Sequence, residues 1–260
     1  MVGETSMLKR ERLLTIKKLV QERGIITVKE LIDQLGVSDM TIRRDLDELA
    51  DSGKLIRVHG GAQSIDSNEN NELSHIEKKE IHLAEKQQIA REAAQLIKEG
   101  DTIYIGPGTT QELIERYLPA ISNLRVVTNS FPIFQSWKNR NNVDLILVGG
   151  NFRQRSGAFI GGLANDTLAE LKFNKAFVGV NGIHNDSMMT ANTEEGKSQS
   201  VALNNAKEKI VLADKFKINR DDFYQFYNLY DVDYLITNPD ISEEILTHYQ
   251  QFTKVKLASE

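Results

Sequence analysis

Apolar residues between positions 28 and 51 recur at helical spacing in two short stretches. Gly36 lies between the stretches and can adopt the positive φ of a tight turn. Ser38 precedes the second stretch, where a hydroxyl can cap free N–H groups of a helix. The pattern predicts a helix-turn-helix, whose second helix enters the DNA major groove. The apolar stripes are Val28, Leu31, Ile32 and Leu35 in the first helix and Ile42, Leu46, Leu49 and Ala50 in the second.

A short basic segment follows the second helix. After Ser52-Gly53, residues 54–61 alternate like a strand and close on a Gly-Gly turn, which predicts the wing of a winged helix-turn-helix. Paired arginines on the exposed helix face can contact phosphates or the guanine edge. An ordinary αα-hairpin around a small core is the alternative, but it does not account for these arginines. The expected DNA-contacting residues are Ser38, Met40, Thr41, Arg43, Arg44, Arg57, His59 and Gly60.

Acidic residues complicate the cationic surface of the second helix. Asp45 lies close to the buried stripe, so we expect it to orient an arginine and not to face DNA. We expect Asp47, Glu48 and Asp51 to form a solvated face, which is the usual role of charged residues on the outside of a helix.

The segments on either side of this module predict its boundaries. Residues 8–21 form an amphipathic helix, and Met7 is an alternative first residue that the pattern leaves open. Residues 63–74 are rich in Ser, Asn, Asp and Glu and indicate an exposed linker. A charged helix over residues 75–99 follows. We therefore expect a DNA-binding domain at 1–62, a linker at 63–80 and a second domain at 81–260.

Short apolar runs alternate with helices after residue 100, which indicates a largely parallel sheet. The predicted fold class is α/β, with an N-terminal winged helix-turn-helix and a C-terminal Rossmann-like α/β domain. In such sheets, ligands bind beyond the carboxyl ends of the strands. The expected strands are 102–105, 125–128, 144–148, 175–180, 209–213 and 233–237, and the expected helices include 111–118 and 132–138.

Glycine and small polar residues collect where these strands end. The loop 106–110 joins a strand to a helix, so its amides suit an anion at a helix N-terminus, although it lacks the lysine of a Walker loop. Lys217 offers a cation for a phosphate, and Glu195 offers an acceptor for a sugar hydroxyl. Each motif alone is common in turns, but together they indicate a phosphorylated small ligand. The expected ligand-binding residues are Gly106, Gly108, Thr109, Thr110, Thr128, Asn129, Ser130, Gly149, Gly150, Glu195 and Lys217.

Composition narrows the class of protein. The 260 residues contain no cysteine, which excludes disulfides and thiolate metal sites, and we expect no metal and no cofactor. No stretch approaches the roughly 20 apolar residues of a membrane helix, and no secretory signal precedes the first helix, so we expect a cytoplasmic protein without a membrane partner. Residues 1–62 carry 11 Lys+Arg and 10 Asp+Glu, while the whole chain has a net charge of −5. So small a positive charge attracts DNA weakly, and we expect a homodimer or homotetramer that presents several modules.

These motifs resemble the DeoR family of bacterial repressors along essentially the whole chain. The resemblance implies a winged helix joined to a sensor domain similar to ribose-5-phosphate isomerase and glucosamine-6-phosphate deaminase. It also implies a repressor of a carbohydrate operon that binds double-stranded operator DNA and releases it when a sugar phosphate binds. The residues that carry the resemblance are 37–46 and 57–62 in the first domain and 106–110, 127–130, 148–150, 213–214 and Lys217 in the second.

A narrower resemblance concerns the branch of this family that controls lactose phosphotransferase systems in Gram-positive bacteria. It rests on Glu72-Leu-Ser-His75, the loop 106–110 and Met189-Thr190. It implies tagatose 6-phosphate as the effector. Where the family often carries Glu-Ala, this chain has Glu195-Gly196, which indicates a more flexible backbone beside a candidate ligand residue.

Two other functions stay open. The first is a sugar-phosphate isomerase or deaminase with a DNA-binding appendage, which needs positioned acid and base groups. The related isomerases have a carboxylate pair after a strand, where this chain has Asn181-Gly-Ile-His184. We do not expect Asp186, in a polar turn, or His184 to replace that pair, so we expect no catalytic residues. The second is an activator, because the sign of regulation depends on where the operator lies.

Overall fold

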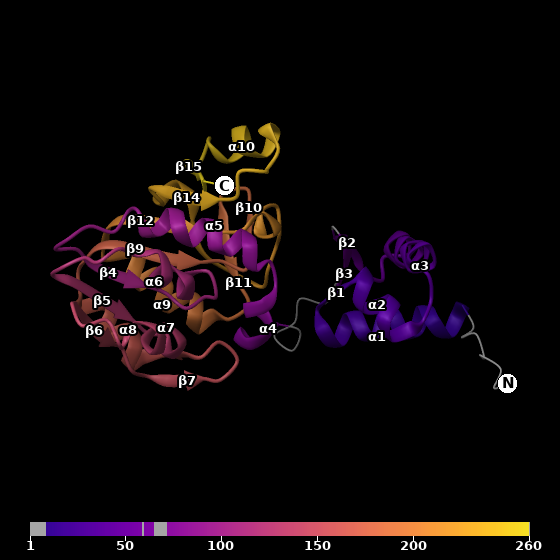
Figure 1. Ribbon diagram of the computed structural model, residues 1–260, viewed down its shortest axis with the longest axis horizontal. Coiled ribbons are helices and arrows are strands. Elements are labelled where there is room, and N and C mark those ends of the chain that lie inside the picture. Colours follow the sequence, from indigo (N-terminus) through magenta and orange to yellow (C-terminus); the bar gives the residue numbers. More distant parts are fainter. Residues whose placement is uncertain (1–8, 59, 65–71, 260) are drawn as a thin grey trace. The chain divides into compact units, whose positions relative to one another are not determined.

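The computed structural model describes residues 9–58, 60–64 and 72–259 of the chain (Figure 1). The chain divides into two compact units, Met1–Leu73 and Ser74–Glu260. Met7 and His59, both named above, lie outside the described residues. Among the helices of the described ranges, none is long and apolar enough to cross a membrane.

The first unit packs three helices against a small antiparallel sheet with the strand order β1-β3-β2. Its core is formed by buried side chains such as Ile16, Ile26, Leu31, Ile42 and Leu46. This is the predicted winged helix-turn-helix. The elements are α1 (Lys9–Arg23), β1 (Ile25–Thr27), α2 (Val28–Leu35), α3 (Asp39–Asp51), β2 (Ile56–Val58) and β3 (Gly61–Gln63).

Local sequence fixes the two helices of the motif. Thr27 and Glu30 form a reciprocal capping box at the start of α2. Gly36 ends α2 in the left-handed conformation, with φ 65°, and the hydroxyl of Ser38 accepts a hydrogen bond from the N–H of Thr41 at the start of α3. The predicted turn glycine and the predicted N-cap are both confirmed.

The wing is a short hairpin that turns at the predicted glycines. Gly60, with φ 77°, reverses the chain, so the segment becomes the antiparallel pair β2 and β3. β3 also pairs with β1, which has only three residues and so no readable alternation. Gly61 permits this pairing, because a Cβ there would lie 2.2 Å from the carbonyl oxygen of Ile26.

The second unit is built around a seven-stranded parallel sheet with the order β15-β14-β12-β9-β4-β5-β6. The chain runs outward from β4 to β6, then returns to β9 on the other side of β4 and continues to β15. The topological switch point, where such sheets bind ligands, therefore lies between β4 and β9. The strands are β4 (Thr102–Ile105), β5 (Leu124–Thr128), β6 (Val143–Leu147), β9 (Phe173–Gly179), β12 (Ala206–Leu212), β14 (Tyr234–Thr237) and β15 (Lys254–Leu257).

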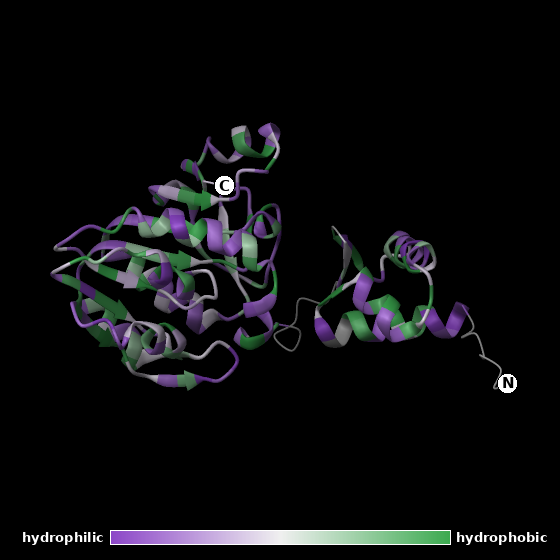
Figure 2. Ribbon diagram, in the orientation of Figure 1, coloured by the Kyte–Doolittle hydropathy of each residue, from purple (hydrophilic) through white to green (hydrophobic). Residues whose placement is uncertain are grey.

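Helices cover both faces of this sheet (Figure 1), and hydrophobic residues concentrate in its central strands (Figure 2). Because strand side chains alternate, Ile103 and Ile105 face one core and Tyr104 faces the other. This is the predicted α/β sensor domain. The first core is shared with α5 (Leu83–Ala94), α6 (Ile114–Tyr117) and α7 (Phe131–Trp137), and the second with α8 (Gly162–Glu170) and α9 (Thr193–Asn204).

Two predicted helices have different bounds. The helix expected over residues 75–99 is divided into α4 (His75–Glu80) and α5, because His82 between them has a positive φ of 54°. Residues 75–80, assigned above to the linker, are therefore helical and belong to the second unit. The helix expected over residues 111–118 is a 3₁₀ turn, η2 (Gln111–Leu113), followed by the four residues of α6.

Several short elements have no counterpart in the sequence analysis. β7 (Asn151–Arg153) and β8 (Ala158–Ile160) form a hairpin, and a three-stranded antiparallel sheet has the order β10-β11-β13. Such segments are too short for a hydrophobic period to show. The remaining elements are β10 (Gly182–His184), β11 (Ser187–Thr190), η3 (Lys215–Lys217), β13 (Tyr224–Asn228), η4 (Leu229–Asp231) and α10 (Glu243–Tyr249).

Candidate functional site

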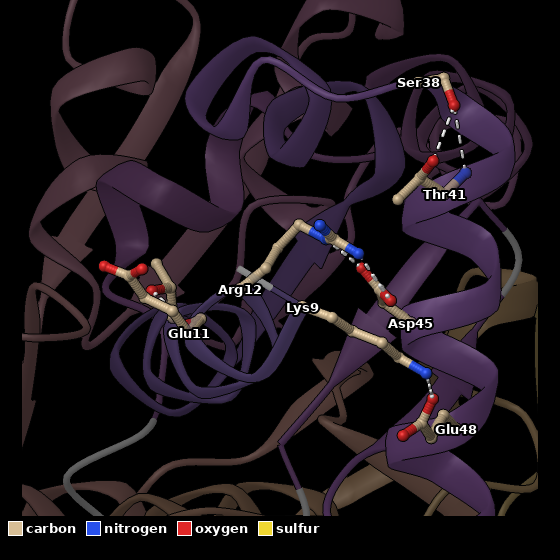
Figure 3. A network of polar contacts seen from close by, with 8 residues as sticks. Lys9, Glu11, Arg12, Ser38, Thr41, Asp45 and Glu48 are labelled. Carbon is tan, nitrogen blue, oxygen red and sulfur yellow. Dashed lines mark hydrogen bonds and ion pairs between the residues drawn. The ribbon is translucent and has the colours of Figure 1, made fainter. Parts of the chain in front are cut away.

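Two ion pairs between α1 and α3 hold the recognition helix in place (Figure 3). Arg12 contacts both carboxylate oxygens of Asp45, at 2.5 Å from Nε and 3.3 Å from Nη2. Only 11% of the Arg12 side chain and 3% of the Asp45 side chain are exposed. Lys9 and Glu48 form a second, exposed pair at 2.6 Å. Asp45 therefore orients an arginine, as predicted, and Glu48 is exposed, as predicted, although its pairing with Lys9 was not foreseen.

The other side of α3 is exposed and carries residues predicted to contact DNA. Met40 is 63% exposed. Arg44 is exposed and has no hydrogen bond or ion pair with any residue that the structure describes. Arg43 instead pairs with Asp39 at 2.6 Å, and this hydrogen bond lowers the pKa of the Asp39 carboxyl. Arg44 is therefore the more available cation of the two.

Small polar groups and the wing complete this surface. The hydroxyls of Ser38 and Thr41 lie 2.9 Å apart at the start of α3 (Figure 3). Arg57 of β2 pairs with Asp47 of α3 at 2.9 Å and also donates to the carbonyl oxygen of Gly61 at 2.7 Å. Asp47, expected to be only solvated, therefore joins the wing to the recognition helix. Gly60 is exposed at the turn of the wing.

The strands β4 and β9 end at the switch point, and glycines lie at both strand ends. The N–H of Gly106 donates to the carbonyl oxygen of Phe177 on β9 at 2.9 Å, which joins the ends of β4 and β9. A Cβ on Gly108 would lie 2.1 Å from Oε1 of Gln111, and a Cβ on Gly179 would lie 2.6 Å from its Nε2. The amide of Gln111 therefore packs closely against both glycines.

The helix that follows the loop after β4 is shorter than predicted, and an anion site in this loop stays a prediction. Thr109 and Thr110 are buried, and the 3₁₀ turn η2 and the short α6 follow them. So short a segment has only a small dipole, because the dipoles of few peptide units add. The hydroxyl of Thr110 is buried and lacks a hydrogen-bond partner among the described residues.

The polar residues after β5 are buried and already have partners inside the protein. Thr128 donates through Oγ1 to the carbonyl oxygen of Ile105 at 2.7 Å. Asn129 accepts a hydrogen bond from the hydroxyl of Tyr104 at 2.7 Å, and Ser130 caps α7. These contacts tie the end of β4 to that of β5, and direct ligand contact by these three residues stays a prediction.

The two glycines after β6 differ from each other. Gly149 is exposed, and nothing lies near the position of a Cβ there. Gly150 has φ 155°, and a Cβ would lie 2.7 Å from the carbonyl oxygen of Ile160 on β8. Close packing against the hairpin therefore requires Gly150, and a ligand role for either glycine stays a prediction.

Glu195, in the first turn of α9, is buried and paired. Its Oε1 accepts a hydrogen bond from Nη1 of Arg153 at 2.9 Å. Burial raises the pKa of the Tyr104 hydroxyl, and the negative charge of Glu195 raises it further, so the carboxylate lies near β4. A Cβ on Gly196 would lie 2.7 Å from Cβ of Phe226. This glycine therefore serves close packing and not the backbone flexibility expected from the sequence.

Basic side chains gather around Asp214, just beyond the end of β12. Nζ of Lys217 lies 3.9 Å from a carboxylate oxygen of Asp214. Nζ of Lys78, on α4, donates to the side chain of Asn181 after β9 at 3.3 Å. Nζ of Lys86, on α5, donates to the backbone carbonyl oxygen of Lys78. The predicted Lys217 is therefore one of several cations at the ends of β9 and β12.

The pKa values of these groups respond to burial and to one another's charges. Burial, followed by the charge of Lys217, lowers the pKa of the Lys86 ammonium to about 8. Burial also lowers the pKa of Lys217, and the charges of Lys78 and Arg220 add to this effect while Asp214 opposes it. Burial lowers the pKa of Arg220 as well, and its Nε has no hydrogen-bond partner in the described part of the chain. Such a group of donors suits an anion.

Sequence reasoning missed three of these four cations. Lys78 and Lys86 lie on helices before β4, and Arg220 lies after η3. Nothing in their local sequence distinguishes them from surface basic residues. Only the order of the strands brings their segments to the same edge of the sheet.

Helix α4 is also attached to the loop after β4. Nζ of Lys79 forms an ion pair with Oε1 of Glu112 at 2.8 Å, and Nε2 of His75 lies 2.9 Å from its Oε2. Burial alone would raise the pKa of Glu112, but the hydrogen bonds from His75 and Lys79 outweigh it and lower the pKa to about 2. The N–H of His75 donates to the carbonyl oxygen of Arg155, between β7 and β8, at 2.7 Å. The segment that follows the linker is thus bound to the strand ends.

The two groups considered as replacements for the isomerase carboxylate pair have partners within the protein. His184 is exposed and lies 2.6 Å from Asp221. Asp186, in the turn of the β10–β11 hairpin, accepts a hydrogen bond from the side chain of Asn228 at 2.8 Å. Neither arrangement positions an acid and a base on the two sides of one ligand.

Comparisons with known proteins match both units. Residues 12–68 match the DeoR-like helix-turn-helix domain, and residues 81–239 match the DeoR C terminal sensor domain. The chain is 45% identical to the lactose phosphotransferase system repressor of Lactococcus lactis subsp. lactis, over 96% of this chain and 98% of that protein. It is 43% identical to the protein of the same name from Streptococcus mutans, over 89% of this chain and 93% of that protein.

Solved structures match this chain at low identity and low TM-score. The full-length sorbitol operon regulator SorC from Klebsiella pneumoniae has a TM-score of 0.43 at 14% identity, over 90% of this chain and 97% of that chain. The ribose 5-phosphate isomerase A of Methanocaldococcus jannaschii has a TM-score of 0.37 at 19% identity, over 51% of this chain and 53% of that chain. The fold assignment therefore rests on the strand order and on the domain matches.

Proposed function

This chain belongs to the DeoR family of DNA-binding repressors, and from that premise we propose what it controls and what releases it. It is a regulator and not an enzyme, because its relatives are named as repressors and its first unit is a DeoR-like helix-turn-helix. We propose that it represses a carbohydrate-utilisation operon in the cytoplasm and leaves the operator when a sugar phosphate binds. The proposed DNA-binding domain is 1–62 and the proposed sensor domain is 81–260, with α4 of the connecting residues docked on the sensor.

The cluster of Lys78, Lys86, Lys217 and Arg220 around Asp214 is the observation that carries this proposal. These four cations face Asp214, with Glu85 acting on Lys86 and Asp222 acting on Arg220, so cations outnumber carboxylates by one. A phosphate bound in this partly buried place would form charge-assisted hydrogen bonds with them. The cluster lies at the ends of β9 and β12, beside the switch point. The predicted residues of the loop 106–110 lie at the neighbouring end of β4.

Tagatose 6-phosphate is the first candidate effector. The relatives are named for lactose phosphotransferase systems, and the resemblance described above implies this ketose phosphate. Fructose 6-phosphate, galactose 6-phosphate and fructose 1-phosphate are the compounds to compare with it, because they differ from it in hydroxyl configuration, ring form or phosphate position.

Helix α4 provides a route from the effector to DNA. It follows the linker in sequence, and it is tied to the loop after β4 through Glu112 and to the end of β9 through Lys78. An effector that binds Lys78 competes with the contact between Lys78 and Asn181 that helps to fix α4. We therefore propose that effector binding changes the position of α4 on the second unit. Effector then favours the state that does not bind DNA, a coupling of typically about 1–3 kcal/mol.

On the DNA side, we propose that two modules of a homodimer or homotetramer bind the two halves of an operator. Arg44, with Met40 exposed beside it on α3, enters the major groove, and Arg43 joins when DNA phosphates replace Asp39. Arg57 and Gly60 bring the wing to the backbone, and we assign the same role to His59. Ser38 and Thr41 contact phosphate at the start of α3, where N–H groups favour anions.

A thermal-shift screen of the full chain tests the effector. Each of the four sugar phosphates is compared with its unphosphorylated sugar, and we expect stabilisation by one phosphate and not by its parent. Lys217→Ala should lose this stabilisation and the release of operator DNA, while Lys197→Ala, an exposed lysine of α9, should keep both. Stabilisation that is equal for phosphates and parent sugars, or unchanged in Lys217→Ala, would show the proposed site to be wrong.

A further inference from the structure

Two glutamine side chains near the end of β4 bury polar atoms that lack partners. Nε2 of Gln111 and Oε1 of Gln199 form no hydrogen bond with any residue of the described ranges, and neither does the hydroxyl of Thr110. Gln111 is 1% exposed and Gln199 is 5% exposed. Because a buried polar group without a partner destabilises a protein, three such groups at one place indicate a missing binding partner.

Glycines make the room that these amides occupy. The amide of Gln111 fills the space in which a Cβ of Gly108 or Gly179 would otherwise lie, and Oε1 of Gln199 lies 3.6 Å from the position of a Cβ on Gly106. Gly106 and Gly108 follow β4, and Gly179 is the last residue of β9. Both amides therefore lie at the switch point of the sheet, where ligands of this fold class bind.

Helix α9 presents Gln199 together with Glu195. The two residues are one turn apart, so their side chains lie on the same side of the helix. Glu195 pairs with Arg153 and raises the pKa of Tyr104 on β4, so this side of α9 faces the end of β4. Gly196 lies on a different side and packs against Phe226. The orientation of α9 thus places the Gln199 amide at the strand ends.

The chemistry of the unpaired atoms specifies their partner. Nε2 of Gln111 needs an acceptor, and Oε1 of Gln199 needs a donor. A phosphate oxygen accepts hydrogen bonds, so it can satisfy Gln111 but leaves Gln199 unpaired unless it carries a proton. A hydroxyl group both donates and accepts, so a ligand with several hydroxyls can satisfy both amides and Thr110.

We propose that Gln111 and Gln199 are specificity-determining residues that bind hydroxyl groups of the effector. This inference rests on the proposed sugar-phosphate effector, and it adds how that effector is oriented in the site. β9 separates β4 from β12, so the glutamines and the cations after β12 lie about two strand spacings apart, roughly 10 Å. That span is comparable to the length of a hexose phosphate, with the sugar chain at β4 and the phosphate at β12.

The test uses the full chain with Gln199→Leu and Gln111→Leu, which keep much of the side-chain volume and remove the amide. Gln95→Leu, at an exposed position after α5, is the matched control. Titration calorimetry measures the Kd of tagatose 6-phosphate, fructose 6-phosphate, glycerol 3-phosphate and inorganic phosphate. The readout is the ratio of the affinity for each hexose phosphate to that for inorganic phosphate.

We expect each glutamine variant to reduce this ratio by about tenfold or more, because one buried hydrogen bond to the sugar is lost. The Kd of inorganic phosphate should stay unchanged. The Tm without ligand should rise, because an unpaired buried polar group is replaced by an apolar one. Gln95→Leu should change none of the three quantities. A purely structural role predicts the opposite, a lower Tm with an unchanged ratio, and that result would overturn the inference.

The outcomes also separate this inference from the proposed function. If phosphates bind the natural chain and both glutamine variants keep its preference among them, the inference is wrong and the sugar-phosphate function stands. If only unphosphorylated sugars bind, and the variants lose this binding, the glutamines bind hydroxyl groups as inferred, but the proposal of a phosphorylated effector is wrong. If none of these compounds binds the natural chain, both proposals are overturned.

Discussion

The two units of this chain present their recognition groups in opposite ways. On α3 of the first unit, Arg44 and Met40 project into solvent, and the buried Arg12–Asp45 pair lies behind them. In the second unit the candidate groups lie inside the protein. The amides of Gln111 and Gln199 are almost fully buried, and the cations around Asp214 are close enough to lower one another's pKa values.

This difference follows from the size of what each unit binds. DNA is too large to be enclosed, so its phosphates are met by exposed cations that salt screens. A small effector can be surrounded, and its binding groups act with less competition from water, which strengthens each hydrogen bond and makes an unpaired one costly. The stability of the first unit should therefore tolerate surface substitutions that leave the Arg12–Asp45 pair intact. The effector affinity of the second unit should change when a single buried polar atom is removed.

The largest effect is expected from Asp45→Ala, which tests whether the exposed surface depends on the buried pair. The change removes the carboxylate that the largely buried Arg12 guanidinium contacts, and we expect it to destabilise the first unit by about 3–5 kcal/mol. Hydrogen exchange of the α3 amides in the full chain measures this loss. Glu48→Ala breaks the exposed pair with Lys9 and should cost only about 0.2–1 kcal/mol. Equal effects of the two changes would contradict the distinction between support and surface.

Arg44→Ala should remove operator binding and leave the sensor unaffected. One arginine contact to a base or phosphate is worth about 1–3 kcal/mol, and an oligomer loses one contact in each bound module. Binding at several salt concentrations shows the change in affinity and in salt dependence. Arg43→Ala should weaken binding less, because Arg43 already pairs with Asp39. The effector-induced rise in Tm should persist in both variants, and its loss would mean that the two units do not act separately.

Glu112→Gln tests whether α4 couples the effector site to the DNA-binding surface. It weakens the ion pairs from His75 and Lys79, so α4 is no longer held to the loop after β4. We expect effector and DNA to bind separately as before, with the coupling of about 1–3 kcal/mol between them reduced. Operator affinity measured with and without effector gives this coupling. Glu115→Gln is the matched control. It weakens the ion pair between Glu115 of α6 and Arg140, and it should leave the coupling unchanged.

The smallest effect is a pH dependence from Lys86. Its folded pKa of about 8 lies below the roughly 10.4 of an unfolded lysine, so the unfolded chain holds more protons between these values. The contribution of Lys86 to stability should therefore rise with pH across this window. A bound phosphate favours the charged ammonium, so its binding should take up a proton near pH 8 and weaken above it.

Calorimetry in two buffers of different ionisation enthalpy measures this proton uptake. Lys86→Met should abolish it, whereas Lys172→Met, at an exposed position, should not. Uptake that is unchanged in Lys86→Met would place the phosphate away from this lysine.

Local patterns were sufficient for most of the first unit. The stripes of α2 and α3, the turn at Gly36 and the cap at Ser38 are properties of neighbouring residues, so the helix-turn-helix was predicted with nearly the observed bounds. The unpredicted β1 is a three-residue strand whose only support is pairing with β3. The sequence placed Asp45 near the core and Asp47 and Glu48 on the surface, as the structure has them. The ion-pair partners of Asp47 and Glu48 were missed, because they come from other elements.

In the second unit, the main strands were predicted because each is a buried apolar run, while their order was not. That order decides which loops meet, and therefore which residues form a site. Lys217 was proposed from its motif, but Lys78, Lys86 and Arg220 gave no local signal. The polar residues after β5 were predicted as ligand groups because they follow a strand, and the structure gives them partners inside the protein.

The sequence by itself determined the helices, the main strands, the two-part organisation and the family, because hydrophobic period, capping residues and turn glycines act over a few neighbouring positions. The tertiary structure alone decided which charges pair, which glycines are needed for close packing, and that Gln111 and Gln199 share the switch point without partners. Such facts depend on contacts between residues as far as 167 positions apart in the chain. Their energy exists only once the sheet brings those residues together.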